Sequence, residues 1–191
     1  MVKIIVITHL LIYLSMFLYK NIVVSKKIKK NIRGKNKEAI LFQLSFFLTI
    51  TISIISILST QVNEFFIPII FLSNNYFQYV GIILLILNLI ISFLALIHMR
   101  DSWRIGIIEG EKTELVTDGI FSISRNPYFL SGIIQFIAYI FLIKNLVVII
   151  FCLLSILLIH KMVIKEETFL ESLHGDKYLK YKKEVARYFI I

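Results

Sequence analysis

Residues 79–98 read YVGIILLILNLIISFLALIH and contain no charged side chain before the final histidine. About 20 consecutive apolar residues are needed to cross the roughly 30 Å of hydrocarbon in a bilayer. The whole chain is 58% hydrophobic, with a mean hydropathy of +0.85, whereas a soluble domain is about 45–50% apolar. Residues 79–98 are therefore predicted to form a transmembrane helix.

Further apolar runs lie on either side of this stretch, at residues 4–24, 39–60, 128–143 and 145–164. The run 39–60 is rich in Thr and Ile, which would favour a strand in water. In lipid the backbone must satisfy its own hydrogen bonds, so a helix is predicted instead. The last two runs are separated only by Lys144 and Asn145, which predicts a tight hairpin of short or tilted helices. We expect an all-α integral membrane protein with about five transmembrane helices and additional cytoplasmic C-terminal helices.

The basic residues indicate how these runs are oriented. Of the 21 Lys and Arg residues, all but Lys3 and Lys144 fall within residues 20–37, 100–125 or 161–187. Alternation of the spans places these three segments on one side of the membrane, which the positive-inside rule makes the cytoplasmic side. The N-terminus is therefore predicted outside and the C-terminus in the cytoplasm.

The net charge of +9 indicates that the protein contacts an anionic partner, and the positions of the basic residues indicate which class of partner is expected. The basic residues flank apolar runs, so they are expected to contact anionic membrane lipids. Binding of nucleic acid is not expected, because it requires a basic face on a soluble domain. Cys152 is the single cysteine, which excludes an intrachain disulfide and a cysteine-based metal site. No metal is expected.

A polar segment ends in Ser124-Arg125-Asn126-Pro127, at the start of the run 128–143. Asn126 suits an N-cap and Pro127 suits the first helical turn, so a helix should begin here. Its free N–H groups, with Arg125 beside them, would form an anion site. The alternative is an ordinary cap next to an arginine that reaches out to the membrane surface.

A second polar segment follows the run 145–164 without a break. On a continuous helix, His160 and Glu167 lie two turns apart on one face, and Glu166 lies on the adjoining flank. Adjacent carboxylates at the membrane border must be paired or hydrated. The alternative is that the helix has already left the bilayer, with Lys165 offsetting the two negative charges.

Another helix is predicted beyond Gly175, a residue type that commonly follows a helix end. Tyr178, Tyr181 and Val185 recur at helical spacing, and lysines occupy much of the remaining surface. The segment is expected to be either an interfacial amphipathic helix or a lid that packs over a site.

These segments together carry a resemblance to a known family. The matching motifs are LVTDGIF at 115–121, SRNP at 124–127, Glu166-Glu167, and the spacing of Gly175, Tyr178, Tyr181, Val185 and Arg187. In this order, with a hairpin-sized gap between the halves, they resemble the isoprenylcysteine carboxyl methyltransferase family and the broader phospholipid methyltransferase group. The resemblance covers roughly residues 98–189. We therefore divide the chain into N-terminal transmembrane helices, 1–97, and a methyltransferase core, 98–191.

The resemblance implies S-adenosyl-L-methionine as the methyl-donating cofactor, bound at the cytoplasmic ends of the last two spans. The positions that match cofactor contacts are Thr113, Glu114, Leu115, Val116, Phe121, Asn126, Pro127, Tyr128, Phe129 and Glu166. A sulfonium cation favours aromatic faces and a nearby carboxylate, and the cofactor's own carboxylate suits a helix N-terminus. The candidate catalytic residues are Glu166, Glu167, His160 and Arg125.

The sequence departs from the family pattern at three positions. Asn126 stands where the family commonly has His, and Phe129 lacks the hydroxyl of the usual tyrosine. Met162, the candidate substrate-contacting residue, occupies the place of a substrate-facing arginine in the eukaryotic enzymes. Recognition of a prenylcysteine carboxylate would then require His160 or Lys161 instead. The acceptor atom, whether carboxylate oxygen, thiol sulfur or amine nitrogen, is left open.

The function expected is S-adenosylmethionine-dependent methyl transfer at the cytoplasmic membrane face. The acceptor would be a lipophilic small molecule or a lipid-modified molecule that enters from the bilayer. The alternative is a non-catalytic membrane scaffold or lipid-binding protein that retains the fold. A small transporter is disfavoured, because the first three runs contain no buried charge. The oligomeric state is not predicted.

Overall fold

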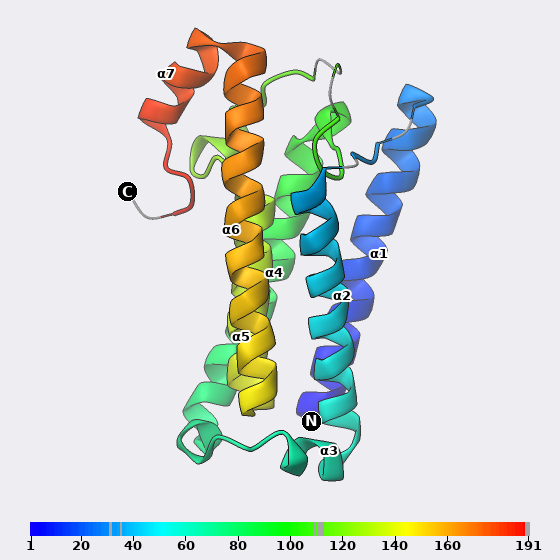
Figure 1. Ribbon diagram of the computed structural model, residues 1–191, viewed down its shortest axis with the longest axis vertical. Coiled ribbons are helices and arrows are strands. Elements are labelled where there is room, and N and C mark those ends of the chain that lie inside the picture. The colour runs from blue at the N-terminus through cyan, green and yellow to red at the C-terminus, as the bar shows by residue number, and fades with distance from the viewer. Residues whose placement is uncertain (31, 35, 109, 111–112, 190–191) are drawn as a thin grey trace.

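The computed structural model describes residues 1–30, 32–34, 36–108, 110 and 113–189, and within these residues it is helical without a β-strand (Figure 1). The long helices are α1 (Val2–Ile28), α2 (Lys37–Leu58), α4 (Asn75–His98), α5 (Pro127–Ile143) and α6 (Leu146–His174). The shorter α-helices are α3 (Thr60–Phe65) and α7 (Asp176–Glu184), and the 3-10 helices are η1 (Ile70–Ser73), η2 (Arg100–Ser102) and η3 (Gly119–Ser122). The all-α prediction is confirmed.

Each predicted span corresponds to one of the long helices. α1, α2, α4 and α6 are long and apolar enough to cross a membrane, whereas α5 is apolar but has only 17 residues. The prediction of a short last helix was wrong, because α6 has 29 residues and continues well beyond the apolar run that ends at 164. Glu and Leu are frequent between that point and His174 and are good helix formers, so the helix leaves the apolar region without ending.

The bundle is assembled around α5. α5 packs against α4 on one side and α6 on the other, while α1 covers α4 and α2 covers α6 (Figure 1). The core is formed by fully buried side chains such as Phe136, Tyr139 and Ile159. Gly81 lets α4 approach α5, because a Cβ at this position would lie 2.7 Å from Leu142 Cγ. The helix hairpin and its two neighbours therefore form one packed unit.

Buried polar side chains join the helices inside the apolar part of the bundle. His9 Nε2 lies 2.8 Å from Asn88 Oδ1, and Asn88 Nδ2 donates to the carbonyl oxygen of Ser131 at 2.7 Å. Thr49 and Ser155 join α2 to α6 through a hydroxyl pair at 2.9 Å. Hydrogen bonds of this kind each stabilise helix association in a membrane by about 0.6–2 kcal/mol. They also fix the relative rotation of α1, α4 and α5.

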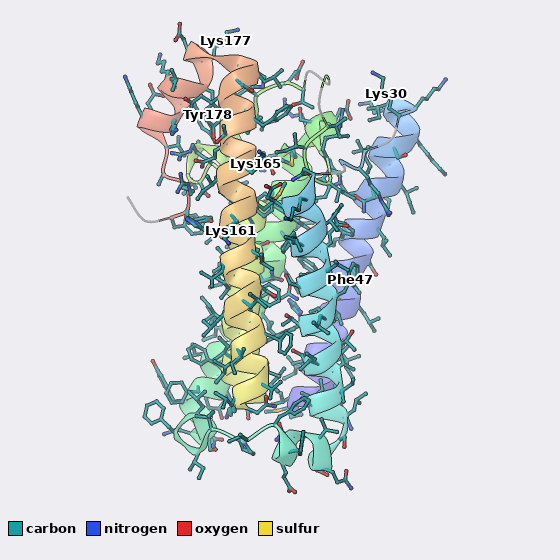
Figure 2. All side chains as sticks on the ribbon, viewed as in Figure 1. Lys30, Phe47, Lys161, Lys165, Lys177 and Tyr178 are labelled. Atoms are coloured by element: carbon teal, nitrogen blue, oxygen red, sulfur yellow. The ribbon has the colours of Figure 1, made fainter. Side chains whose placement is uncertain are left out.

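The polar segments gather at one end of the bundle (Figure 1). The C-terminal end of α1, the segment after α4, the C-terminal part of α6 and α7 all lie there, and α3 and η1 lie at the opposite end. Lys30, Lys165 and Lys177 mark this polar end in Figure 2. Lys35 and Lys112, which also counted toward the predicted orientation, lie outside the described residues. The assignment of this end to the cytoplasm stays a prediction.

Candidate active site

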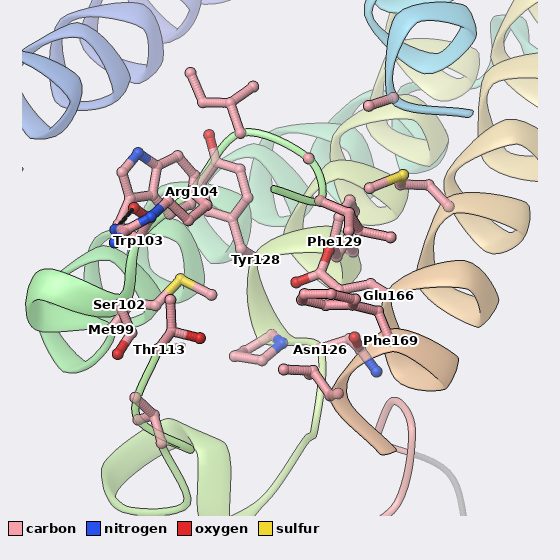
Figure 3. A pocket seen from close by; sticks show the side chains of 18 of the residues that line it. Met99, Ser102, Trp103, Arg104, Thr113, Asn126, Tyr128, Phe129, Glu166 and Phe169 are labelled. Atoms are coloured by element: carbon pink, nitrogen blue, oxygen red, sulfur yellow. Dashed lines mark hydrogen bonds between the residues drawn. The ribbon is translucent and has the colours of Figure 1, made fainter. Parts of the chain in front are cut away.

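A cavity of about 290 Å³ lies at the polar end of the bundle. Its walls come from the start of α5, the C-terminal part of α6, the segment after α4, and the facing sides of α1 and α2. Figure 3 shows Met99, Ser102, Trp103, Arg104 and Thr113 on one side, and Asn126, Phe129, Glu166 and Phe169 on the other, with Tyr128 between them. The volume is close to the about 300–1,000 Å³ typical of small-molecule sites.

Backbone pairing holds the segment after α4 over the cavity. Gly34 N donates to the carbonyl oxygen of Ile105 at 2.8 Å, and Ile105 N donates back to the carbonyl oxygen of Ile32 at 2.8 Å. A Cβ on Gly34 would lie 2.0 Å from the carbonyl oxygen of Ile107, so only glycine permits this approach. Asn36 Oδ1 accepts a further bond from Ile107 N at 3.0 Å. The α1–α2 connection thus supports one wall of the cavity.

The turn before α5 also requires a glycine. Gly119 has φ +60°, a conformation that residues with a Cβ rarely adopt. A Cβ here would in addition lie 2.1 Å from the imidazole Cδ2 of His98. The Asp118-Gly119 pair therefore turns the chain tightly against the end of α4, and places Phe121 in the cavity wall.

The predicted cofactor-binding residues all line this cavity. They are Thr113, Glu114, Leu115, Val116, Phe121, Asn126, Pro127, Tyr128, Phe129 and Glu166. They come from the segment before η3, from the start of α5 and from α6, which are distant in sequence and are brought together by the packing of α5 between α4 and α6. The structure therefore gives one common location to residues that were selected by resemblance alone.

Glu166 is the acidic side chain that α6 presents to the cavity. It is half-buried, and Figure 3 shows it beside Phe129 and Phe169. Within the described part of the chain, its carboxylate forms no hydrogen bond or ion pair. A carboxylate among aromatic rings in a partly dry cavity favours a cationic ligand. This arrangement fits a positively charged ligand and leaves room for one.

Glu167, the next residue, faces away from the cavity and is only 3% exposed. It accepts hydrogen bonds from Arg125 Nη2 at 3.0 Å, from Asn126 Nδ2 at 2.8 Å and from Arg187 Nη2 at 2.9 Å. We call Glu167, Arg125, Asn126 and Arg187 the clamp. The clamp joins the start of α5, the middle of the polar part of α6 and the C-terminal tail.

Arg125 is held entirely by protein groups. Nε and Nη2 donate to the Glu167 carboxylate at 3.2 and 3.0 Å, and Nη1 donates to the carbonyl oxygens of Lys182 and Val185. The predicted helix start at Pro127 is confirmed, but Asn126 makes no side-chain capping bond, because its amide is directed to Glu167. All three guanidinium nitrogens are thus engaged, so Arg125 supplies positive charge near the cavity but no free hydrogen bond.

The comparison with known families covers this part of the molecule. The family model described as phospholipid methyltransferase matches residues 76–177. The chain belongs to the phospholipid methyltransferase family. No curated protein matches it. The matched residues extend from α4 to the start of α7, so they contain the polar walls of the cavity and most of the clamp, whereas α1 and α2 lie outside the match.

His160, another candidate catalytic residue of this family member, lies on the clamp side of α6. Its Nδ1 lies 3.2 Å from the hydroxyl of Tyr188, and it does not belong to the cavity wall. Burial raises the pKa of Tyr188 to about 12, so its hydroxyl stays protonated. Hydrogen bonds to Glu167 raise the pKa of Arg187. His160 and Glu167 share a face, as predicted from helical spacing, but this face contacts the tail.

Met162 does line the cavity, on the same side of α6 as Glu166. It is 1% exposed, packs in a cluster with Ala39 and Ile107, and its Sδ lies 3.4 Å from Asn36 Nδ2. The position therefore carries no charge in this family member. Arg33 and Arg104 line the cavity from other segments, which reasoning about α6 alone could not reveal.

Several cavity residues were missed by the sequence reasoning. α1 contributes Tyr13, Leu14 and Phe17, and α2 contributes a larger aromatic group, Phe42, Phe46 and Phe47. Tyr13 reaches α5 directly, because its hydroxyl donates to that of Tyr128 at 3.1 Å. The available signal was the spacing of four residues between aromatics in each helix, which places them on one face. This family member thus uses its unmatched helices to complete the cavity.

A second, more open cavity of about 560 Å³ lies between α7 and the segment before η3. It is lined by polar side chains that include Lys177, Lys180 and Glu184, and it shares Glu114, Leu115 and Tyr181 with the first cavity. The first cavity therefore adjoins a second, polar cavity at the polar end of the bundle.

Proposed function

We propose that this protein transfers a methyl group from S-adenosylmethionine to a lipophilic acceptor at the cytoplasmic face of a membrane. The observation that carries the proposal is the two-part character of a single cavity. One part of its lining contains Glu166 and other residues of the polar end. The other part, which we call the apolar arm, is lined mainly by apolar residues of α1 and α2 and includes Phe47, which is 59% exposed. Such a cavity suits a water-soluble methyl donor and a lipid-soluble acceptor at the same time.

The polar part contains the residues that would hold the methyl donor. Thr113, Glu114, Tyr128, Phe129 and Glu166 surround it. When bound, S-adenosylmethionine supplies an activated methyl group. Glu166 contributes negative charge that favours a cationic ligand, and the aromatic rings of Tyr128 and Phe129 contribute polarisable faces. The protein's own task is then to position two reactants in line and to exclude water.

The apolar arm would hold the hydrocarbon part of the acceptor. It is lined by Leu14 and Phe17 of α1 and by Phe42, Phe46 and Phe47 of α2. An acyl or prenyl chain that enters from the bilayer passes from one apolar environment to another, so these side chains would let it reach the cavity without exposing its hydrocarbon to water. The acceptor atom, whether oxygen, sulfur or nitrogen, depends on the head group that this chain carries toward Glu166.

A non-catalytic lipid-binding protein is the second candidate function. The buried and neutral Met162, in the place of a substrate-facing arginine, is the observation that favours it. The two candidates differ in one measurable property. A methyltransferase that uses S-adenosylmethionine must also bind S-adenosylhomocysteine, the product that the donor leaves. A lipid-binding scaffold has no need of a site for either molecule.

The test is calorimetric binding of S-adenosylhomocysteine to the purified protein in several detergents. The methyltransferase proposal predicts saturable binding at one site per chain. Absence of binding in every detergent in which the protein remains folded would contradict it and favour the scaffold.

The proposed orientation is tested separately. Reporter fusions within residues 26–30 and after Phe189 are both expected to report a cytoplasmic location, because the basic segments gather at that end (Figure 2). An extracellular signal from either fusion would contradict the proposed topology.

A further inference from the structure

Residues 59–74 connect α2 to α4 and contain α3 and η1, and we call them the connecting segment. The segment lies at the end of the bundle opposite to the polar end (Figure 1). Its side chains at Phe65, Ile70 and Phe71 are 82%, 85% and 78% exposed, while Glu64 is its single charged residue. Large apolar side chains that are exposed together in this way mark a contact with a membrane or with another protein.

Hydrogen bonds hold the connecting segment against the turn between α5 and α6. Ile69 N donates to the carbonyl oxygen of Lys144 at 2.7 Å, and Leu146 N donates to that of Phe66 at 3.1 Å. The buried side chain of Asn145, in the turn, donates from Nδ2 to one side-chain oxygen in α2 and to another in α3. The exposure of the apolar side chains therefore belongs to a segment that is fixed in place.

The turn between α5 and α6 lies too close to the polar end to reach the far surface of a bilayer. α5 has 17 residues and is therefore about 25 Å long. The apolar part of α6, from Asn145 to Lys161, rises about 24 Å, whereas the hydrocarbon layer is about 30 Å thick. The turn would then lie about 5 Å inside the hydrocarbon of the leaflet at this end, which we call the far leaflet.

Polar groups of the turn need partners at this depth. Lys144 has a side chain long enough to extend its ammonium group to the surface. The backbone groups of the turn cannot do so, and in hydrocarbon they must be satisfied by the protein itself. The connecting segment supplies these partners through the hydrogen bonds described above.

We propose that the connecting segment is inserted in the far leaflet, where Phe65, Ile70 and Phe71 contact lipid chains at the border of the hydrocarbon. One layer of backbone is about 5 Å thick, so the segment supplies the thickness that the hairpin lacks. The proposal goes beyond methyl transfer and does not depend on it. Its consequence is that the hairpin is seated at a fixed depth, which keeps the cavity at the opposite border of the bilayer.

Lipid is the partner, rather than a protein, because the surface that α4 presents to the membrane continues into the connecting segment. The ring of Phe71 packs against that of Phe77 in α4, with centroids 5.4 Å apart. Tyr76 and Tyr79, in the first turns of α4, are also exposed, and exposed tyrosines are typical of the border between hydrocarbon and water. Phe71 therefore extends a membrane border that α4 already forms.

Spin labels at matched positions measure the depth of the connecting segment. Cys152 is the single cysteine and is fully buried, so folded wild type should take up no thiol-specific label. Phe71→Cys and Glu64→Cys are labelled, reconstituted in phosphatidylcholine vesicles, and exposed to oxygen, which concentrates in hydrocarbon, and to a water-soluble nickel chelate. The ratio of the oxygen to the nickel collision rate should be at least about threefold higher at position 71 than at position 64.

Glu64→Cys is the control, because it is an exposed position on the same segment that should face water. Equal ratios at the two positions would overturn the proposal, since the segment would then lie wholly in water or wholly in lipid. Protection of position 71 from both reagents would also overturn it, because another protein or a second copy of this chain would then cover the apolar side chains. Ile70→Cys repeats the measurement at a second inserted position, and a ratio as low as that of Glu64→Cys would contradict the proposal in the same way.

Discussion

Glu166 and Glu167 are adjacent, chemically identical and placed on the same helix, but they serve different regions of the molecule. Glu166 faces a cavity and has no ion-pair partner among the described residues, whereas Glu167 is buried in the clamp with two arginines and an asparagine. The difference arises from the turn of about 100° between successive residues of a helix. One carboxylate is available to a ligand, and the other holds three distant segments together.

The largest effect is expected from Glu167→Gln. The substitution leaves Arg125, whose side chain is 7% exposed, without its carboxylate partner. Breaking a buried pair in this way costs about 3–5 kcal/mol, and the solvent access of Arg187 places this case near the lower value. The unfolding temperature in detergent should fall by several degrees. Ligand binding should disappear at the lower temperature at which the variant unfolds. An unchanged unfolding temperature would show that the clamp does not stabilise the protein.

A smaller and more selective effect is expected from Glu166→Gln. Attraction between unit charges about 4–5 Å apart at an effective dielectric of about 20 amounts to a few kcal/mol at most. The variant should bind S-adenosylmethionine at least about tenfold more weakly. Its unfolding temperature should be equal to that of wild type or higher, because a like charge beside Glu167 has been removed.

Glu184→Gln is the control for this measurement. Its side chain is 61% exposed at the end of α7, where it forms only a surface pair with Lys180 at 4.0 Å. Such a pair contributes little to stability, so affinity and unfolding temperature should both stay at the wild-type values. Equal weakening of ligand binding at positions 166 and 184 would exclude Glu166 from the site.

These two glutamates also show how far sequence reasoning can reach. Helical spacing correctly separates the face of His160 and Glu167 from the flank of Glu166. It does not indicate which neighbour each face meets, because that depends on contacts between segments as distant as Arg125 and Glu167. The resemblance selected Glu166 together with other residues that line one cavity. It also selected Glu167, and helical spacing pointed to His160, but neither of these two residues lines the cavity.

The N-terminal helices were the least predictable part of the site. Their apolar runs identify spans, because length and hydropathy suffice for this. Their contribution to the cavity depends on how α1 and α2 are rotated and paired, and this is set by contacts such as His9 with Asn88 and Thr49 with Ser155. Polar residues inside a span therefore carried information that the hydropathy pattern alone could not supply.

The smallest effect is expected for the choice of acceptor. Met162, one turn before Glu166, stands where the resemblance places a substrate-facing arginine, so this position gives the cavity no cation. An uncompensated buried charge costs several kcal/mol, although Arg33 and Arg104 on other walls reduce this cost. A farnesylcysteine analogue should therefore be methylated about fivefold more slowly than a neutral lipophilic acceptor. Comparable initial rates would show that Arg33 or Arg104 recognises the carboxylate, and substitution of each by Gln would identify which.

The most direct test of the central claim is transfer of labelled methyl from S-adenosylmethionine into a lipid extract of the source cells. Wild-type protein is expected to label a lipid-soluble species, and Glu166→Gln is expected to label it much more slowly at the same limiting donor concentration. Glu184→Gln should match wild type. No label above that of a protein-free control, from a protein that binds S-adenosylhomocysteine, would contradict methyl transfer as the function of this cavity.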